Sequence, residues 1–303
     1  MSGETGLWAL FAALVSAVLA IDLGILHRKA HVITLKEAAF WTAAWSALAL
    51  AFAGVIALVS GSERALQFVA GFILEKALSA DNMFVFIVIF DYFAVPALYQ
   101  PRVLHWGILG AILMRFLFIC AGLTLVNTFY WMIYVFGAVV IYTGAKMAFT
   151  DGAQVRPQDN VALKVLRQVM PLSAQSHGQG FFVRLGGSLH ATPLFAALLV
   201  VEFSDVLFAM DSIPAVIAIT TDAFVVYTSN VFAILGLRAL FFLLANLMGM
   251  FRFMKTGISL ILVFVGLKML GGHFYHVPTG VSLCVIAGIL AAAIAASLLA
   301  GKK

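Results

Sequence analysis

The sequence predicts an all-α polytopic membrane helix bundle of about nine transmembrane helices, with an inverted three-helix repeat, the N-terminus outside and the C-terminus inside. Two observations predict the class: 64% of the 303 residues are hydrophobic and 10% are charged, whereas about a quarter of a soluble domain is charged. A third observation, one charged pattern that occurs twice, predicts the repeat. We interpret residues 1–303 as a single transmembrane domain.

Nine apolar runs are long enough to cross a bilayer, which needs about 20 residues. They are 7–26, 38–59, 66–90, 103–125, 128–149, 193–218, 224–250, 256–271 and 279–300. The first run follows a segment without Lys or Arg and lacks an Ala-x-Ala pattern. We therefore interpret it as a span and not as a signal peptide.

The basic residues predict the orientation, because Lys and Arg favour cytoplasmic connections. With the N-terminus outside, the outer connections carry Arg64 alone. The cytoplasmic segments carry twelve basic residues: Arg28, Lys29, Lys36, Arg102, Arg156, Lys164, Arg167, Arg184, Arg252, Lys255, Lys302 and Lys303. If the number of spans differed by one, these basic residues would be divided between the two sides of the membrane. Their distribution therefore supports nine spans.

One long connection, 150–192, is cytoplasmic in this topology. Within it, residues 160–170 place apolar side chains at helical spacing beside Lys164 and Arg167. This pattern predicts a helix that lies on the membrane surface, or a solvated linker helix.

Spans three to five repeat as spans six to eight, giving repeat one at about 66–149 and repeat two at about 193–271. The matched positions are Glu75 with Asp205, Asp81 with Asp211, Arg115 with Arg238, Gly144 with Gly266 and Lys146 with Lys268. Because each unit has three spans, the second copy enters the membrane from the opposite side. Such inverted repeats are typical of transporters with a binding site between the two copies.

Six carboxylates fall inside the predicted spans, where each costs about 2.5 kcal/mol or more. They are Asp22, Glu75, Asp81, Glu202, Asp205 and Asp211. Acids in the membrane are functional candidates by default. The alternative is permanent ion pairing with Lys76, Arg115 and Arg238, which are too few to neutralise all six.

The polar atoms beside these acids are oxygens, including those of Asn82 and Ser212, and neither acidic cluster contains a His or Cys. Ligation by oxygen alone is typical of Mg²⁺, Ca²⁺ or Mn²⁺. The predicted metal site therefore consists of Asp22, Glu75, Asp81, Asn82, Glu202, Asp205, Asp211 and Ser212.

Helix geometry limits how these acids cooperate, since six residues separate two side chains by about 9 Å along the axis and about 120° around it. We therefore predict two pairs across the repeats, Glu75 with Asp211 and Asp81 with Asp205, with Glu202 and Asp22 on the cytoplasmic approach. Pro214 removes a backbone donor and so favours a break in span six.

The other polar residues suggest simpler roles. Arg115 and Arg238 are predicted to pair with unoccupied carboxylates, or to form structural ion pairs. Lys146 and Lys268 are expected to reach the lipid interface, and His273 and His276 to lie in a solvated loop. The basic residues form no stripe, so nucleic acid is not an expected partner.

At these residues the sequence resembles the TerC/Alx family of bacterial integral membrane proteins, within the LysE-like transporters. The resemblance covers nearly the whole chain and includes Ile21-Asp22-Leu-Gly-Ile-Leu-His27, Glu75-Lys-Ala-Leu-Ser79-Ala-Asp81-Asn82 and Glu202-Phe-Ser-Asp205-Val-Leu-Phe-Ala-Met-Asp211-Ser212-Ile-Pro214. It implies a multi-pass protein of the bacterial inner membrane that exports Mn²⁺, in a family named for tellurium resistance.

Export of a divalent ion against the membrane potential needs coupling, and no nucleotide-binding loop is visible, so proton exchange at the same carboxylates is expected. The partners are then a divalent ion, protons and lipids. Neither a cofactor nor an enzyme activity is expected. Two alternatives stay open: a carrier of tellurium oxyanions, and a scaffold that assists secretory or membrane protein biogenesis through 150–192.

Overall fold

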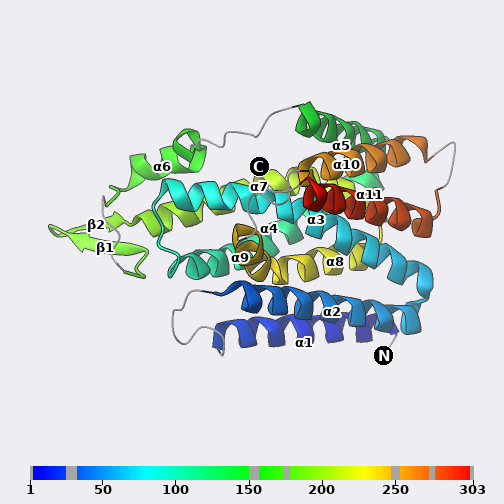
Figure 1. The fold of residues 1–303 in the computed structure, drawn as a ribbon, viewed down its shortest axis with the longest axis horizontal. Coiled ribbons are helices and arrows are strands. Elements are labelled where there is room, and N and C mark those ends of the chain that lie inside the picture. Colours follow the sequence, from blue (N-terminus) through cyan, green and yellow to red (C-terminus); the bar gives the residue numbers. More distant parts are fainter. Residues whose placement is uncertain are drawn as a thin grey trace.

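The computed structural model describes residues 3–24, 33–149, 157–173, 178–246, 253–272 and 277–300, without the side chains at 22–24 and 159. It confirms the all-α membrane class: long helices run side by side along the long axis of the molecule (Figure 1). In chain order the elements are α1 Gly3–Gly24, α2 Leu35–Ser60, α3 Ser62–Tyr92, α4 Gln100–Thr128, α5 Met132–Phe149, a 3-10 turn Pro157–Asp159, α6 Val161–Val169, β1 Phe182–Leu185, β2 Ser188–Ala191, α7 Pro193–Ile217, α8 Ala223–Leu235, α9 Leu237–Asn246, α10 Met254–Gly271 and α11 Thr279–Leu299.

Seven of the described helices are long and apolar enough to cross a membrane, and the bent pair α8 and α9 forms an eighth candidate. Helix α3 is the longest, with 31 residues, although Glu75, Lys76 and Asp81 interrupt its apolar sequence. With α3 included and α8 and α9 taken together, nine helical stretches of the described residues overlap the nine predicted apolar runs in sequence.

The contacts among the helices share one pattern. Helix α3 packs on α8, α4 packs on α7, and α5 packs along α10. Helices α5 and α10 lie close together where their glycines meet. A Cβ added at Gly266 would lie only 2.9 Å from the carbonyl oxygen of Gly137. Exchanging α3, α4 and α5 for α7, α8 and α10 maps these contacts onto one another. The inverted repeat predicts this exchange, but the opposite membrane orientation of the two units stays a prediction.

Helix α8 occupies the centre of the bundle. Eleven of its 13 residues are buried, and it contacts α1, α2, α3 and α4. Three consecutive polar residues, Thr228, Ser229 and Asn230, are among those buried. A polar side chain at such a place needs a hydrogen-bonding partner, so α8 brings polar chemistry into the apolar core.

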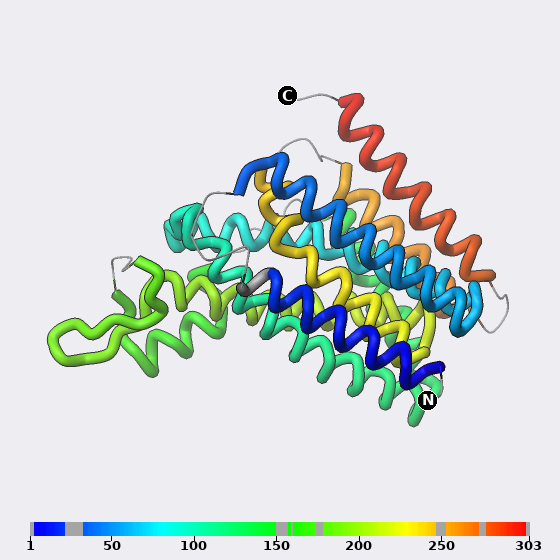
Figure 2. The backbone as a smooth tube through the Cα atoms, turned by 90° about the horizontal axis from the view of Figure 1, so that it is seen from below, coloured from blue at the N-terminus to red at the C-terminus, as the bar shows by residue number. Residues whose placement is uncertain are grey.

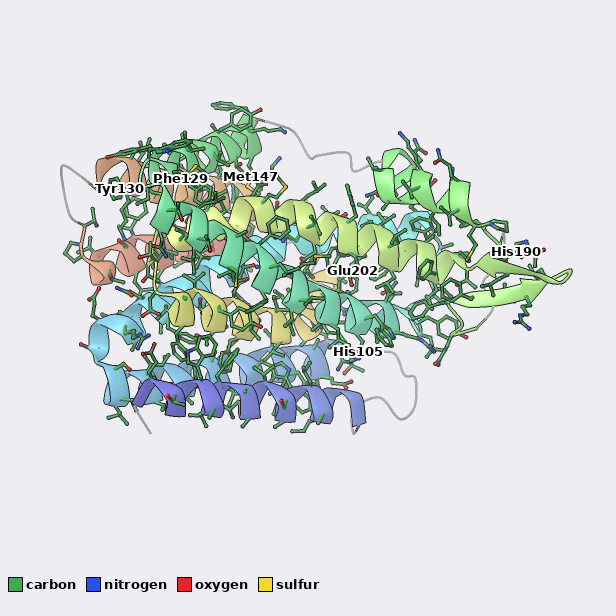
Figure 3. The ribbon with its side chains drawn as sticks, turned by 180° about the vertical axis from the view of Figure 1, so that it is seen from behind. His105, Phe129, Tyr130, Met147, His190 and Glu202 are labelled. Carbon is green, nitrogen blue, oxygen red and sulfur yellow. The ribbon has the colours of Figure 1, made fainter. Side chains whose placement is uncertain are left out.

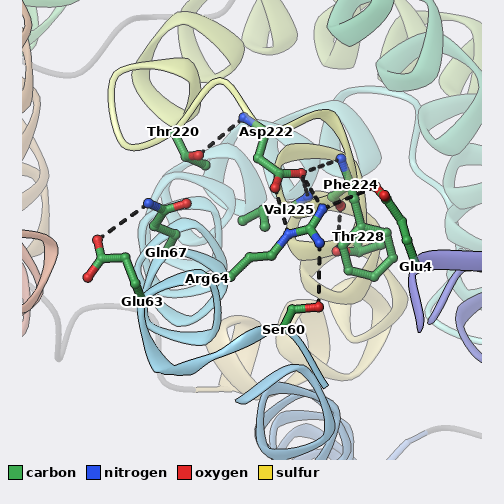
Figure 4. Close-up of polar contacts among 10 residues, drawn as sticks. All are labelled: Glu4, Ser60, Glu63, Arg64, Gln67, Thr220, Asp222, Phe224, Val225 and Thr228. Atoms are coloured by element: carbon green, nitrogen blue, oxygen red, sulfur yellow. Dashed lines mark hydrogen bonds and ion pairs between the residues drawn. The ribbon is translucent and has the colours of Figure 1, made fainter. Parts of the chain in front are cut away.

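An ionic cluster ties the helix ends together on the side of the N-terminus (Figure 4). Arg64 on α3 donates to both carboxylate oxygens of Asp222, at 2.6 and 3.1 Å, and to Glu4 on α1 at 3.3 Å. Asp222 also caps α8, because its carboxylate accepts from the backbone N–H groups of Phe224 and Val225. The cluster therefore fixes α8 against α1 and α3.

In the connection between α5 and α7, helix α6 and the strands β1 and β2 lie at the opposite end of the molecule from the N-terminus (Figures 1 and 2). The predicted helix is confirmed as α6, whose Leu163 and Leu166 are buried in one cluster with Leu194 and Ala197 of α7. Its packing face is thus covered by protein and not by lipid. The antiparallel hairpin β1–β2 that follows was not predicted. Contact of α6 with the membrane stays a prediction.

The prediction of a break in span six is wrong. Helix α7 continues through Pro214 and ends at Ile217. In a transmembrane helix, neighbouring helices and side chains can compensate for the backbone donor that proline lacks. The break lies in the next span, where α8 and α9 meet at Gly236 with a bend of 48°.

Candidate functional site

A buried ionic centre lies where α3, α4, α7 and α8 meet. Arg115 of α4 forms an ion pair with Glu75 of α3, and neither side chain is exposed. The other terminal nitrogen of Arg115, Nη2, lies 3.8 Å from Oδ1 of Asp205 on α7. One cation therefore stands between two acids that occupy equivalent positions in the two predicted repeats.

Three further side chains complete the centre. Asn230 of α8 accepts a hydrogen bond from Arg115 and donates one to Glu75, at 3.4 Å. Ser212 accepts from Arg115, and Ser79 donates to Glu75, each at 3.5 Å. Asn230 is not among the predicted site residues, although an Asn at the end of the Thr-Ser-Asn run in an apolar span is a visible signal.

Asp205 carries an unsatisfied oxygen. Its Oδ2 atom is buried and has no hydrogen-bond partner, a condition that is costly for a carboxylate. Asp205 also lines a small pocket between α3, α4, α7 and α9. The lining residues are Phe86, Leu104, Gly107, Ile108, Ala111, Val201, Asp205, Leu237 and Arg238. Apart from Asp205 and Arg238, the pocket wall is apolar.

Glu202 lies one turn from Asp205 on α7, at the contact with α4 (Figure 3). An added Cβ at Gly110 of α4 would stand 2.2 Å from both carboxylate oxygens of Glu202. The carboxylate therefore lies directly on the backbone of α4, in space that only a glycine leaves free. It also interacts electrostatically with Asp205, so the two acids are coupled along α7.

The second acid of each repeat lies apart from this centre. Asp211 accepts a hydrogen bond from Thr143 of α5 at 3.1 Å and interacts electrostatically with Lys146. Asp81 interacts with Lys255 at the start of α10, and Asn82 beside it is buried. Thr143 was also missed, since a threonine among apolar residues carries no distinctive signal.

The structure therefore groups the predicted site residues differently from the predicted pairs. Glu75 and Asp205 meet at Arg115, in place of the pairs Glu75 with Asp211 and Asp81 with Asp205. Glu75 and Asp205 occupy equivalent positions on α3 and α7 and meet where these two helices cross. The predicted pairs assume instead that these two acids lie at different depths in the membrane. Within the described residues, no three Asp, Glu, His or Cys side chains are close enough to hold a metal together. The side chain of Asp22 lies outside the described residues, as do His273 and His276.

The centre can hold or exchange positive charge. Glu75 and Asp205 share the guanidinium of Arg115, so carboxylates exceed guanidinium groups by one among these contacting side chains. Because a guanidinium cannot lose its proton in a protein, Arg115 acts as a resident cation between Glu75 and Asp205. A second cation that enters this centre must compete with Arg115 for the same oxygens.

These features define a polytopic helical membrane protein with an ionic centre enclosed between two sets of helices. The comparisons place it further: the model of the Integral membrane protein TerC family matches residues 60–303. The chain belongs to the TerC family. The resemblance noted in the sequence is thereby confirmed.

Curated relatives cover nearly the whole chain. It is 49% identical to the "Uncharacterized membrane protein STKORF319" of Myxococcus xanthus over 99% of this chain and 94% of that protein. It is 46% identical to the "Putative membrane-bound redox modulator Alx" of Escherichia coli K12, over 95% and 92%. A membrane protein of Rickettsia felis is 38% identical over 96% and 97%. No solved structure matches the chain.

Gly110 provides a direct test of the position of Glu202. Gly110→Ala is expected to lower the free energy of unfolding by about 1–3 kcal/mol, because the new methyl group overpacks the contact with the carboxylate. In a Glu202→Ala background the same change is expected to cost nothing, or to stabilise, since Ala favours helices over Gly. Thermal unfolding of the purified protein in detergent measures both effects.

The matched control is Gly107→Ala, one turn away on the same face of α4, where an added Cβ would lie 3.4 Å from Val201. That distance is an ordinary contact, so this variant is expected to match the wild type. An equal loss from Gly110→Ala with and without Glu202 would show that the carboxylate does not occupy this space.

Proposed function

We propose that this protein exports a divalent metal cation, with Mn²⁺ favoured, from the cytoplasm across the bacterial inner membrane, in exchange for protons. The observation that carries the proposal is the buried, unpartnered oxygen of Asp205 at a pocket within the membrane bundle. A buried carboxylate oxygen without a hydrogen-bond donor is costly at such a position. Binding and release of a cation give it a function.

The ligand chemistry supports a hard cation. Every polar side chain that contacts the centre, apart from Arg115, offers oxygen: Glu75, Asp205, Ser79, Ser212 and Asn230. Carboxylate, hydroxyl and amide oxygens suit Mg²⁺, Ca²⁺ and Mn²⁺. The choice of Mn²⁺ among these rests on the family resemblance.

Arg115 gives the proposal a switching element. In the described arrangement its single positive charge lies between Glu75 and Asp205. A divalent ion that takes these oxygens would displace the guanidinium, and release of the ion would let Arg115 return. The centre would thus carry compensating positive charge both before and after the ion passes, which keeps the cost of two buried acids low.

Proton exchange provides the driving force. Moving a divalent cation outward against about 100 mV costs about 4.6 kcal/mol before any concentration gradient. A carboxylate that binds protons when it is empty and metal when it is ionised couples the two flows at one site. Glu202 and Asp205, adjacent on α7, are the residues that we assign to this exchange.

The name of the Alx relatives, membrane-bound redox modulator, suggests another class of function. Both cysteines of this chain, Cys120 on α4 and Cys284 on α11, are free, so the described arrangement offers no dithiol pair for disulfide exchange. An oxyanion carrier is disfavoured because acids exceed basic groups at the centre. Ion transport therefore remains the function that the geometry supports best.

The test is flux in proteoliposomes that contain the purified protein. Mn²⁺ movement is expected to be several-fold faster with an imposed proton gradient opposite to the metal gradient than without one, because the same carboxylates carry both ions. Ca²⁺ and Mg²⁺, supplied separately, rank the substrates. Equal rates with and without the gradient would refute the exchange, and no flux of any of the three ions would refute the transport function.

A further inference from the structure

The bend in span seven has a specific partner on α3. Lys76, the residue next to Glu75, donates a hydrogen bond to the backbone carbonyl of Ala233 at 3.3 Å. The Lys76 nitrogen also lies 5.7 Å from the centroid of the Phe72 ring. The sequence indicates Lys76 as one possible ion-pair partner for the acids. In the structure, Lys76 instead donates to the backbone of α8.

The carbonyl of Ala233, which accepts from Lys76, would be part of the hydrogen bonding of a continuous helix. In an unbroken helix, the carbonyl of residue 233 accepts from the N–H of residue 237, four positions later. Here α8 ends at Leu235 and α9 starts at Leu237. Insertion of a side chain into this hydrogen-bond ladder is a recognised cause of sharp kinks, and a cation at a helix C-terminus is also favoured by the helix dipole.

Gly236 supplies the space for this contact. An added Cβ at Gly236 would lie 2.5 Å from the Lys76 nitrogen, but 3.5 Å from the nearest atom of Trp45, which is an ordinary contact. The backbone at Gly236 has φ −89° and ψ 2°, a conformation open to other residues. A larger residue here would therefore displace the Lys76 nitrogen, while the backbone conformation itself does not need glycine.

The corresponding position of the first repeat supports the same reasoning. In the alignment of the two repeats, Leu113 matches Gly236. Leu113 lies within α4, which is continuous from Gln100 to Thr128. The position matching Lys76 in the second repeat is Val206, which has no donor. The bend occurs in the copy where a lysine from the neighbouring helix reaches the carbonyl.

Glu75 and Lys76 hold α8 at two points one turn apart, Asn230 and Ala233. Just beyond the bend, Arg238 of α9 lines the pocket that Asp205 also lines. We propose that Lys76 is a positioning residue: its bond to the Ala233 carbonyl creates the bend between α8 and α9 and so places Arg238 beside the Asp205 pocket. This role goes beyond the proposed transport and does not depend on which ion is carried.

The experiment measures the bend itself. Spin labels are placed at Cys120 on α4 and at an Asn246→Cys substitution at the exposed end of α9, in a Cys284→Ala background, and their distance is measured by pulsed electron paramagnetic resonance. Lys76→Met keeps a chain of similar length but removes the donor. It is expected to shift the distance by several ångströms, up to about 12 Å if a ten-residue helix straightens completely.

Gly236→Ala is the second variant, because its methyl group displaces the Lys76 nitrogen while every other side chain is kept. It is expected to shift the distance in the same direction, and to add no further shift in the Lys76→Met background. The matched control is Gly54→Ala in α2, where an added Cβ meets nothing within 4 Å. It is expected to leave the distance unchanged in both backgrounds.

An unchanged distance in Lys76→Met overturns the proposal, as does a shift from Gly236→Ala that is equally large with and without Lys76. Should Lys76→Met not fold, Gly236→Ala alone decides, since an unchanged distance there shows that the bend does not need the lysine contact. The readout is a distance and not a flux. Failure of this inference is therefore distinguishable from failure of the proposed transport.

Discussion

Arg115→Gln is expected to lower the free energy of unfolding by about 3–5 kcal/mol, the cost of leaving buried charges without their partner. Glu75 and Asp205 would remain enclosed with no guanidinium between them. If these acids form a cation site, Mn²⁺ should restore stability to this variant. At a concentration of 100 Kd, a ligand that binds the folded state alone contributes about 2.7 kcal/mol.

Thermal unfolding in detergent, with and without excess Mn²⁺, measures this effect. Stabilisation by Mn²⁺ is expected to be larger in Arg115→Gln than in the wild type, where Arg115 competes for the same oxygens. Arg64→Gln is the matched control, because it also removes an arginine paired with an acid, Asp222, but at the end of the bundle. Equal stabilisation of Arg115→Gln and Arg64→Gln by Mn²⁺ would contradict a cation site at Glu75 and Asp205.

Asp205→Asn is expected to reduce Mn²⁺ flux in proteoliposomes by about 10–100-fold. The substitution keeps the shape of the side chain but removes the charge, and a hydrogen bond or ligand contact to a charged group is worth about 1.5–3 kcal/mol, which corresponds to that range. Initial rates at matched protein density in the vesicles measure the change.

Asp91→Asn is the control for this substitution. Asp91 also lies on a long helix of the bundle, α3, but its side chain is exposed near the end of that helix. Its flux is expected to equal that of the wild type. Were Asp205→Asn as active as Asp91→Asn, the unpartnered oxygen of Asp205 would have no part in transport.

The positions of the spans could be predicted well because bilayer thickness and hydropathy act locally. The run 193–218 corresponds to Pro193–Ile217, and 279–300 to Thr279–Leu299. Each span needs only its own apolar residues to be recognised. The exception is span seven, where the run 224–250 is one apolar segment in the sequence but two helices in the structure.

The candidate site could be predicted only in part. Glu75, Asp205 and Arg115 were recognised individually, because a charge inside an apolar run is visible without a partner. Their grouping was not recognised, since the crossing of α3 and α7 decides which acids meet. Asn230 and Gly110 were missed for a related reason: a single amide or glycine acquires its role only from the side chain that packs against it.

The sequence by itself determined the membrane class, the positions of the long apolar helices and the acids within them, since these depend on the free energy of placing each residue in lipid. The tertiary structure alone decided that Arg115 stands between Glu75 and Asp205, that Glu202 lies on Gly110, and that the bend falls at Gly236 rather than at Pro214. Such contacts join residues from different helices, and their energies depend on distances that no local pattern contains.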